Sequence, residues 1–141
     1  MSNAFAGQGS KLKRGDGATP ENFTPLAEVK NIQRTGAKAD QVDVSNMDSV
    51  GAYREYLPTL LDAGEISFTG NYIPGDSSQQ LLQNDFDNRR LGNWQILLPN
   101  ALGHWAFAAY VTSFDFDLAH DKEAVITCKL KVTGKPVFTT P

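Results

Sequence analysis

The 141-residue chain has only one cysteine, Cys128, so no internal disulfide can hold its fold together. It also lacks long apolar runs, since no segment approaches the roughly 20 residues that a membrane-spanning helix needs. Residues 1–14 contain no apolar stretch of the kind that defines a signal peptide. The length predicts a single domain over residues 1–141, and the composition, 40% hydrophobic and 21% charged, is that of an ordinary globular protein.

Positive charge is scarce as well, because the formal net charge of the chain is −3. Proteins that grip nucleic acid neutralise its phosphates with lysine and arginine, so the composition argues against that class. A short basic patch near the N-terminus, formed by Lys11, Lys13 and Arg14, is interpreted as a solvated strand end.

Catalytic motifs are missing too. No serine lies in a nucleophile elbow, and no glycine-rich segment ends in the Gly-Lys-Ser/Thr of a phosphate loop. Four side chains could in principle bind a metal ion: Asp115, Asp117, His120 and Asp121. The first two share a strand face while the others fall in the next turn, so we interpret the group as a polar strand end. We therefore predict a protein that is not an enzyme and has no cofactor or metal site.

Alternation of apolar and polar residues predicts a mainly β chain. The expected strands cover residues 23–32, 42–44, 65–73, 94–98, 104–118 and 123–133, with a loop at 36–40, a bulge near Ser113 and a break at 134–136. One helix is expected over about residues 76–90, with Asp76 as its N-cap and Leu82 and Phe86 on its apolar stripe. These elements favour an antiparallel β-sandwich or barrel with one flanking α-helix.

The connection over about residues 45–62 shows no clear period. A connection this long is usually either functional or disordered, and this one is too apolar for disorder. Its large apolar side chains are Tyr53, Tyr56, Leu57, Leu60 and Leu61. We predict that this loop is an inter-subunit contact of a self-assembling protein.

Four stretches of the chain, in this order, resemble the major tail tube protein of long non-contractile-tailed bacteriophages. They are residues 11–17, 23–32, 42–49 and 53–68, the last beginning Tyr-Arg-Glu-Tyr-Leu-Pro, and a Pro-Gly turn and the amphipathic helix follow. The resemblance implies a tail-tube-like subunit that forms hexameric rings stacked into a tube. It further implies a lumen that holds the tape-measure protein and conducts double-stranded DNA during genome ejection without binding it specifically.

The same resemblance implies partners and a location. The partners would be copies of the chain, the tape-measure protein, and the tail terminator and tail-tip proteins, with no membrane involved. The protein would reside in the tail tube of the virion after assembly in the host cytoplasm.

An inner sheet that is wet on its channel side would suit such a tube. We predict that the polar face of the strand at residues 65–73 lines the lumen: Glu65, Ser67, Thr69 and Asn71. Its neighbour would be the strand ending at Thr133, whose Lys129 and Lys131 require neighbouring carboxylates to offset their charge.

Three alternatives stay open at this point. The chain could be a tube subunit of a type VI secretion or phage-tail-like bacteriocin system. It could be a small β-barrel protein that binds an apolar ligand under Trp94 and Trp105, or a metal-dependent hydrolase around Asp115 and His120.

Overall fold

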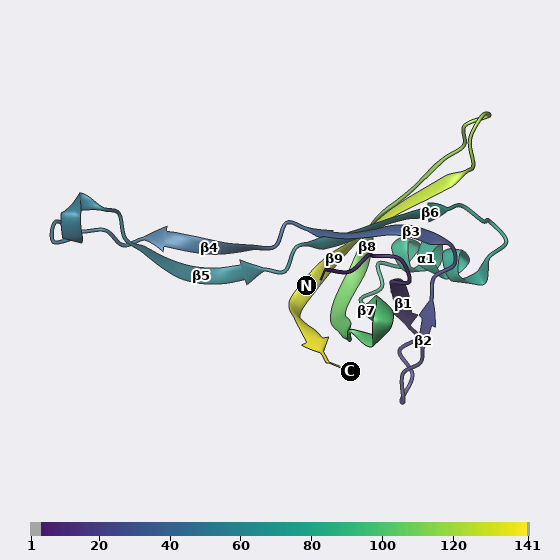
Figure 1. The fold of residues 1–141 in the computed structure, drawn as a ribbon, viewed down its shortest axis with the longest axis horizontal. Helices are drawn as coiled ribbons and strands as arrows, with labels where there is room; N and C mark the ends of the chain where they lie inside the picture. The colour runs from purple at the N-terminus through teal and green to yellow at the C-terminus, as the bar shows by residue number, and fades with distance from the viewer. Residues whose placement is uncertain (1–3, 141) are drawn as a thin grey trace.

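The computed structural model describes residues 4–140, so residues 1–3 and 141 of the predicted domain lie outside the described part. Its body is a seven-stranded antiparallel sheet in the order β2-β1-β7-β8-β9-β6-β3 (Figure 1). The strands are β1 (Lys11–Gly15), β2 (Phe23–Pro25), β3 (Val29–Thr35), β6 (Glu65–Asn71), β7 (Gly92–Leu97), β8 (His104–Asp117) and β9 (Val125–Thr139). The predicted mainly β, antiparallel fold with one helix is confirmed.

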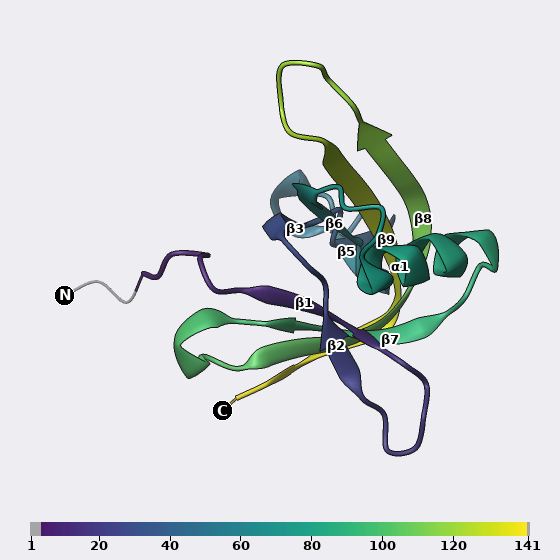
Figure 2. The ribbon, with the colours of Figure 1, turned by 90° about the vertical axis from the view of Figure 1, so that its right-hand side faces the viewer.

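One face of the sheet carries the core. On β6, Ile66 and Phe68 are buried while the residues between them are half-buried, as the strict alternation of this strand predicts. Cys128 and its neighbours on β9 continue the same apolar layer, and burial raises the pKa of the Cys128 thiol to about 12. Figure 2 shows the curled sheet, with β8 and β9 extending beyond the other strands as a hairpin.

The long β8–β9 pair contains two irregularities. The pairing shifts between Val111 and Ser113, which confirms the predicted bulge. The predicted break at residues 134–136 is wrong, because β9 continues to Thr139. Gly134 has a φ of +78°, and the pairing shifts around it, so the segment is a bulge inside one strand.

The predicted strand over residues 23–32 is in fact two strands, β2 and β3. Between them Leu26 is buried, and its N–H donates to the carbonyl oxygen of Leu12 at 2.9 Å. Glu28 then adopts a positive φ of 51°, which no strand residue can keep. The chain therefore turns from one outer edge of the sheet to the other.

The single α-helix, α1 (Ser77–Asp87), packs against β8. Asp76 caps it as predicted, since its carboxylate accepts from the N–H of Gln79 at 3.2 Å. Leu82 is fully buried, but Phe86 is 40% exposed, so the predicted packing of the helix through both side chains is only half correct. The helix ends at Asp87 instead of residue 90, because Arg89 already has a positive φ of 52°. No helix of residues 4–140 is long and apolar enough to cross a membrane.

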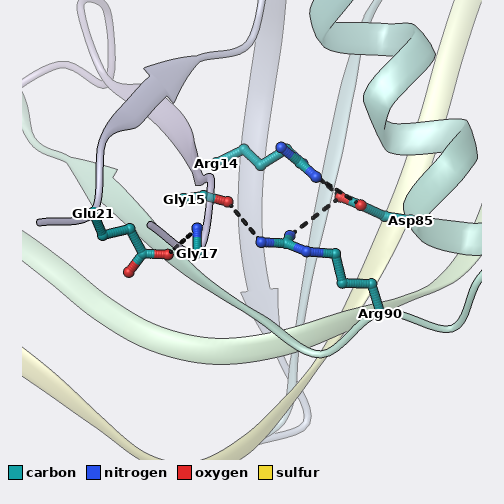
Figure 3. A network of polar contacts seen from close by, with 6 residues as sticks. All are labelled: Arg14, Gly15, Gly17, Glu21, Asp85 and Arg90. Atoms are coloured by element: carbon teal, nitrogen blue, oxygen red, sulfur yellow. Dashed lines mark hydrogen bonds and ion pairs between the residues drawn. The ribbon is translucent and has the colours of Figure 1, made fainter. Parts of the chain in front are cut away.

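An ion-pair network ties α1 to β1, the second strand of the sheet (Figure 3). Arg14 donates from Nε and Nη2 to the two carboxylate oxygens of Asp85 at 2.6 and 2.8 Å. This hydrogen bonding raises the pKa of Arg14. Arg90 lies 3.6 Å from the same carboxylate and donates to the carbonyl oxygen of Gly15 at 3.0 Å. A bidentate pair of this kind fixes orientation as well as distance, so it sets where the helix sits.

The remaining strands form an arm that projects away from the body (Figure 1). β4 (Lys38–Asp43) and β5 (Tyr56–Asp62) pair with each other as a separate two-stranded antiparallel sheet. Two predictions are therefore wrong: residues 38–40 begin a strand instead of lying in a loop, and the last part of the predicted connection, residues 56–62, is the strand β5. Two 3-10 turns, η1 (Val50–Ala52) and η2 (Pro99–Ala101), complete the structure.

Candidate functional site

The arm is the first candidate site, since its surface is unusually apolar. Nine of its large hydrophobic side chains are exposed: Val42, Val44, Met47, Val50, Tyr53, Tyr56, Leu57, Leu60 and Leu61. Leu60 and Leu61 are 76% and 80% exposed. Apolar patches of this extent on a protein surface mark interaction sites.

The apolar residues of the arm occupy both faces of the ribbon. Successive side chains of a strand point to opposite faces, so Tyr56 and Leu57 lie on opposite faces of β5. The pairing with β4 shifts between Leu57 and Leu61, which marks a bulge, and Leu61 lies beyond it on the same face as Tyr56. Val42 lies opposite Leu57 in the pairing register. An isolated two-stranded ribbon is marginally stable in water. This one therefore needs a covering surface on each side.

The tip of the arm, residues 44–55, is held by its own hydrogen bonds. Ser45 and Glu55 close it, since the Val44 N–H donates to the Glu55 carbonyl at 2.9 Å and the Glu55 N–H donates to Ser45 Oγ at 2.6 Å. Asn46 accepts from the N–H of Asp48 at 2.8 Å. The tip thus has a defined shape that presents Met47 to the solvent, where it is fully exposed.

The root of the arm is fixed to the body. Asp62, the last residue of β5, accepts from Lys131 Nζ at 2.9 Å and from the N–H of Gly64 at 2.8 Å. The Lys131 hydrogen bond lowers the pKa of Asp62, and the same contact raises the pKa of Lys131. Arg34 donates to the carbonyl oxygen of Ala63 at 3.1 Å. These contacts set the direction in which the arm leaves the sheet.

The open face of the sheet is the second candidate site. The predicted lumen residues Glu65, Ser67, Thr69 and Asn71 all lie on one face of β6 and are half-buried. They pair with β9 as predicted: Glu65 faces Lys131, and Ser67 faces Lys129. Lys131 is neutralised by Asp62, which supplies one of the carboxylates that the sequence required. Whether this face lines a lumen stays a prediction.

The structure gives little support to the two alternatives that the sequence left open outside the tube proteins, the ligand-binding protein and the metal-dependent hydrolase. Trp94 is buried to 1% exposure, so it cannot cover a ligand, whereas Trp105 borders a small apolar cavity of about 140 Å³. Ligand pockets for drug-sized molecules usually measure about 300–1,000 Å³. No three His, Cys, Asp or Glu side chains among residues 4–140 lie close enough to hold a metal ion.

Comparison with known proteins identifies the family of the chain. The family model described as lambda phage tail tube protein matches residues 5–139. No curated protein sequence matches the chain significantly.

Three solved structures share the fold. The tail of an empty gene transfer agent particle, refined with C6 symmetry, is 23% identical, with 97% of this chain and 100% of that chain covered and a TM-score of 0.79. The SPP1 tail tube is 14% identical, with 98% and 80% covered and a TM-score of 0.75. The six-fold symmetrised baseplate of the anti-feeding prophage is 13% identical, with 99% and 98% covered and a TM-score of 0.72.

At these identities the structures establish the fold alone, whereas the family model spans nearly the whole chain. The chain belongs to the lambda phage tail tube protein family and is a tube subunit.

Proposed function

We propose that copies of this chain close into six-membered rings, that the rings stack into a tube, and that the arm is the joint between copies. The observation that carries the proposal is the arm itself, which exposes nine large apolar side chains on the two faces of its ribbon and at its tip. A monomer gains nothing from holding such a surface in water, whereas a neighbouring copy would cover it.

The two open edges of the sheet also support the closure of copies into a ring. β2 and β3 are the two outer strands, and an open sheet edge is a ready template for pairing with another chain. In a closed ring, every copy can pair one of its sheet edges with the next copy, so that no edge is left unpaired. The symmetry of six is proposed from the gene transfer agent tail with C6 symmetry and the six-fold symmetrised anti-feeding prophage baseplate.

The open face of β6 and β9 is proposed as the lumen wall. A channel that conducts double-stranded DNA must not hold it, so its wall should carry little net positive charge. Here Lys131 is paired with Asp62 and lies across from Glu65. The lumen would hold the tape-measure protein before it passes DNA, and terminator and tail-tip proteins would close the two ends.

The role we propose is structural and not enzymatic. It needs no cofactor, and assembly would occur in the host cytoplasm before the tube joins the virion. The likeness to the sheath-tube complex of an extracellular contractile injection system favours one second candidate, a tube subunit of such a system. A neighbouring gene for a sheath protein would point to that candidate, whereas a tape-measure gene without a sheath gene points to a non-contractile tail.

Replacing Leu57 and Leu60 together with serine tests the joint, because it removes two of the exposed apolar side chains of β5. Each leucine contributes about 1.5–3 kcal/mol when a neighbour buries it, so the double variant should stay a folded monomer that forms no tubes. Leu91→Ser serves as the control, since Leu91 is 60% exposed and lies outside the arm. Normal tubes from the double variant in negative-stain electron microscopy would show that the arm is not the joint.

A further inference from the structure

The arm carries the entire net charge of the protein. Of the 13 basic and 16 acidic side chains in the chain, residues 39–61 hold one and four: Arg54 against Asp40, Asp43, Asp48 and Glu55. Twelve of each sign remain for the rest of the molecule, which is therefore neutral overall. A surface that receives this arm should accordingly be apolar and locally positive.

A groove with this chemistry lies at the root of the arm. It encloses about 450 Å³, and its lining includes Arg34, Lys38, Leu61, Lys135 and Pro136. It continues towards the small apolar cavity beside Trp105, because both share Arg34 and Pro136. The groove is thus an apolar floor with three cations at its rim.

The cations of the groove are available to a partner. Within residues 4–140, neither Lys38 nor Lys135 forms an ion pair, although Lys38 lies opposite Asp62 in the pairing register and helps to lower the pKa of that carboxyl. The one carboxylate in the lining, Asp62, is already engaged by Lys131. Arg34 uses Nε for the Ala63 carbonyl and lies 5.7 Å from the centre of the Trp105 ring, which leaves its terminal nitrogens open.

The tip of the arm has the complementary chemistry. Met47, Val50 and Tyr53 are 103%, 83% and 79% exposed, and the carboxylates of Asp48 and Glu55 stand exposed among them. We propose that the tip of the arm of one copy docks into the root groove of a second copy. This inference rests on the proposed function and names the receptor that the arm would bind.

The contact must join two copies, because the tip cannot reach its own root. β4 runs from Lys38 to Asp43, which at roughly 3.3 Å per residue amounts to about 17 Å, and the tip lies beyond its end. The roots of two docked copies are therefore separated by more than ~17 Å. The docking of a tip into a groove is a head-to-tail contact, because the two copies use different surfaces. Such contacts can join a series of copies instead of stopping at a dimer.

Charge reversal tests the pairing of tip and groove. Lys135→Glu should raise the critical concentration for polymerisation at least ~tenfold, since a close interfacial charge pair has a coupling energy of about 1.5 kcal/mol or more. Asp48→Lys should do the same, and the Lys135→Glu/Asp48→Lys double variant should recover most of the loss. Lys122→Glu is the matched control, because Lys122 is exposed and lies outside the groove. Unfolding curves of each variant monitor whether the subunit still folds.

The outcomes of this experiment distinguish a failure of the proposed groove from a failure of the proposed tube function. If Lys135→Glu polymerises like the wild type, or if the double variant recovers nothing, the groove is not the receptor although the tube proposal stands. If the wild-type protein itself never polymerises, the proposed function fails and the docking inference fails with it.

A second measurement does not depend on charge. Met47→Cys and Ala37→Cys place one thiol at the tip and one at the groove, and the native Cys128 is fully buried. A flexible bismaleimide should link assembled double-cysteine protein into a ladder of covalent oligomers, while either single variant gives no ladder. Absence of the ladder from formed tubes would overturn the docking inference.

Discussion

Lys131, in the middle of β9, donates from Nζ to Oδ1 of Asp62, the last residue of β5, at 2.9 Å. This ion pair joins the root of the arm to the open face of the sheet. It therefore links the two surfaces proposed for assembly and for the lumen, because one side chain belongs to each.

The Asp62–Lys131 pair should make subunit stability depend on pH. The pKa of folded Asp62 lies below its ordinary value of 3.8, so the contribution of the pair is present above 3.8 and is lost as the pH falls through the lowered pKa. The melting temperature of Asp62→Asn should therefore lie below that of the wild type at neutral pH and approach it in strong acid. Asp121→Asn, an exposed carboxylate outside the arm, serves as the control. An equal gap at both pH values would mean that the ion pair is not responsible.

Phe86 and Leu82 should differ in their contribution to stability. Leu82→Ala empties a fully buried site and should cost about 2–5 kcal/mol of unfolding free energy. Phe86→Ala should cost less than half as much as Leu82→Ala, because 40% of Phe86 is already exposed. Urea denaturation of the two variants measures the ratio. Equal costs would mean that Phe86 is covered in the folded subunit.

Asp85 should matter far more than its neighbour on the same helix. Asp85→Ala leaves Arg14 without its bidentate partner in a largely buried position, and breaking a buried pair costs about 3–5 kcal/mol. Asp87→Ala removes an exposed carboxylate and should change the unfolding free energy by about 0.5 kcal/mol or less. Similar losses in the two variants would show that the network in Figure 3 does not anchor α1.

Gly64 should tolerate alanine less well than Gly134. Both have positive φ, +86° and +78°, so each alanine pays about 1–2 kcal/mol of backbone strain. At Gly64 the added methyl group would also collide with the backbone of Thr35 and Ala37, whereas at Gly134 nothing lies within 4 Å. The comparison isolates the close approach of the two chain segments at the arm root. Equal melting temperatures for the two variants would contradict that packing.

Glu65 offers a test of the lumen. Glu65→Lys changes the charge by two units in every subunit, beside Lys131 on the same face. If the face lines the channel, tubes should still form while phosphate attraction slows DNA passage at low salt. Genome ejection measured from virions with the variant tube gives the rate. An unchanged rate at low salt would place this face on the outside.

The sequence predicted the body of the fold well because alternation depends only on burying one face of a strand. Ile66 and Phe68 on β6 and Cys128 on β9 are buried as expected. The stripe of α1 was less informative. Spacing identified the face that holds Leu82 and Phe86, yet it could not show how much of that face the sheet covers.

The arm escaped prediction for a related reason. Tyr56 and Leu57 are adjacent on β5, and so are Leu60 and Leu61, so apolar residues do not alternate with polar ones along this strand. The root groove left no signal at all, since Arg34, Leu61 and Lys135 come from three distant segments that only the folded sheet brings together. The apolar content of the arm was still visible in the sequence, and that was enough to predict a contact surface.

The central claim is that this chain is a self-assembling tube subunit whose arm binds the next copy. Cryo-electron microscopy of the purified protein, concentrated until it polymerises, tests it most directly. The account predicts a hollow tube of stacked six-membered rings, with each arm tip seated in the root groove of a neighbouring copy. Particles that stay monomeric at every concentration, or tubes whose arms extend freely into solvent, would contradict it.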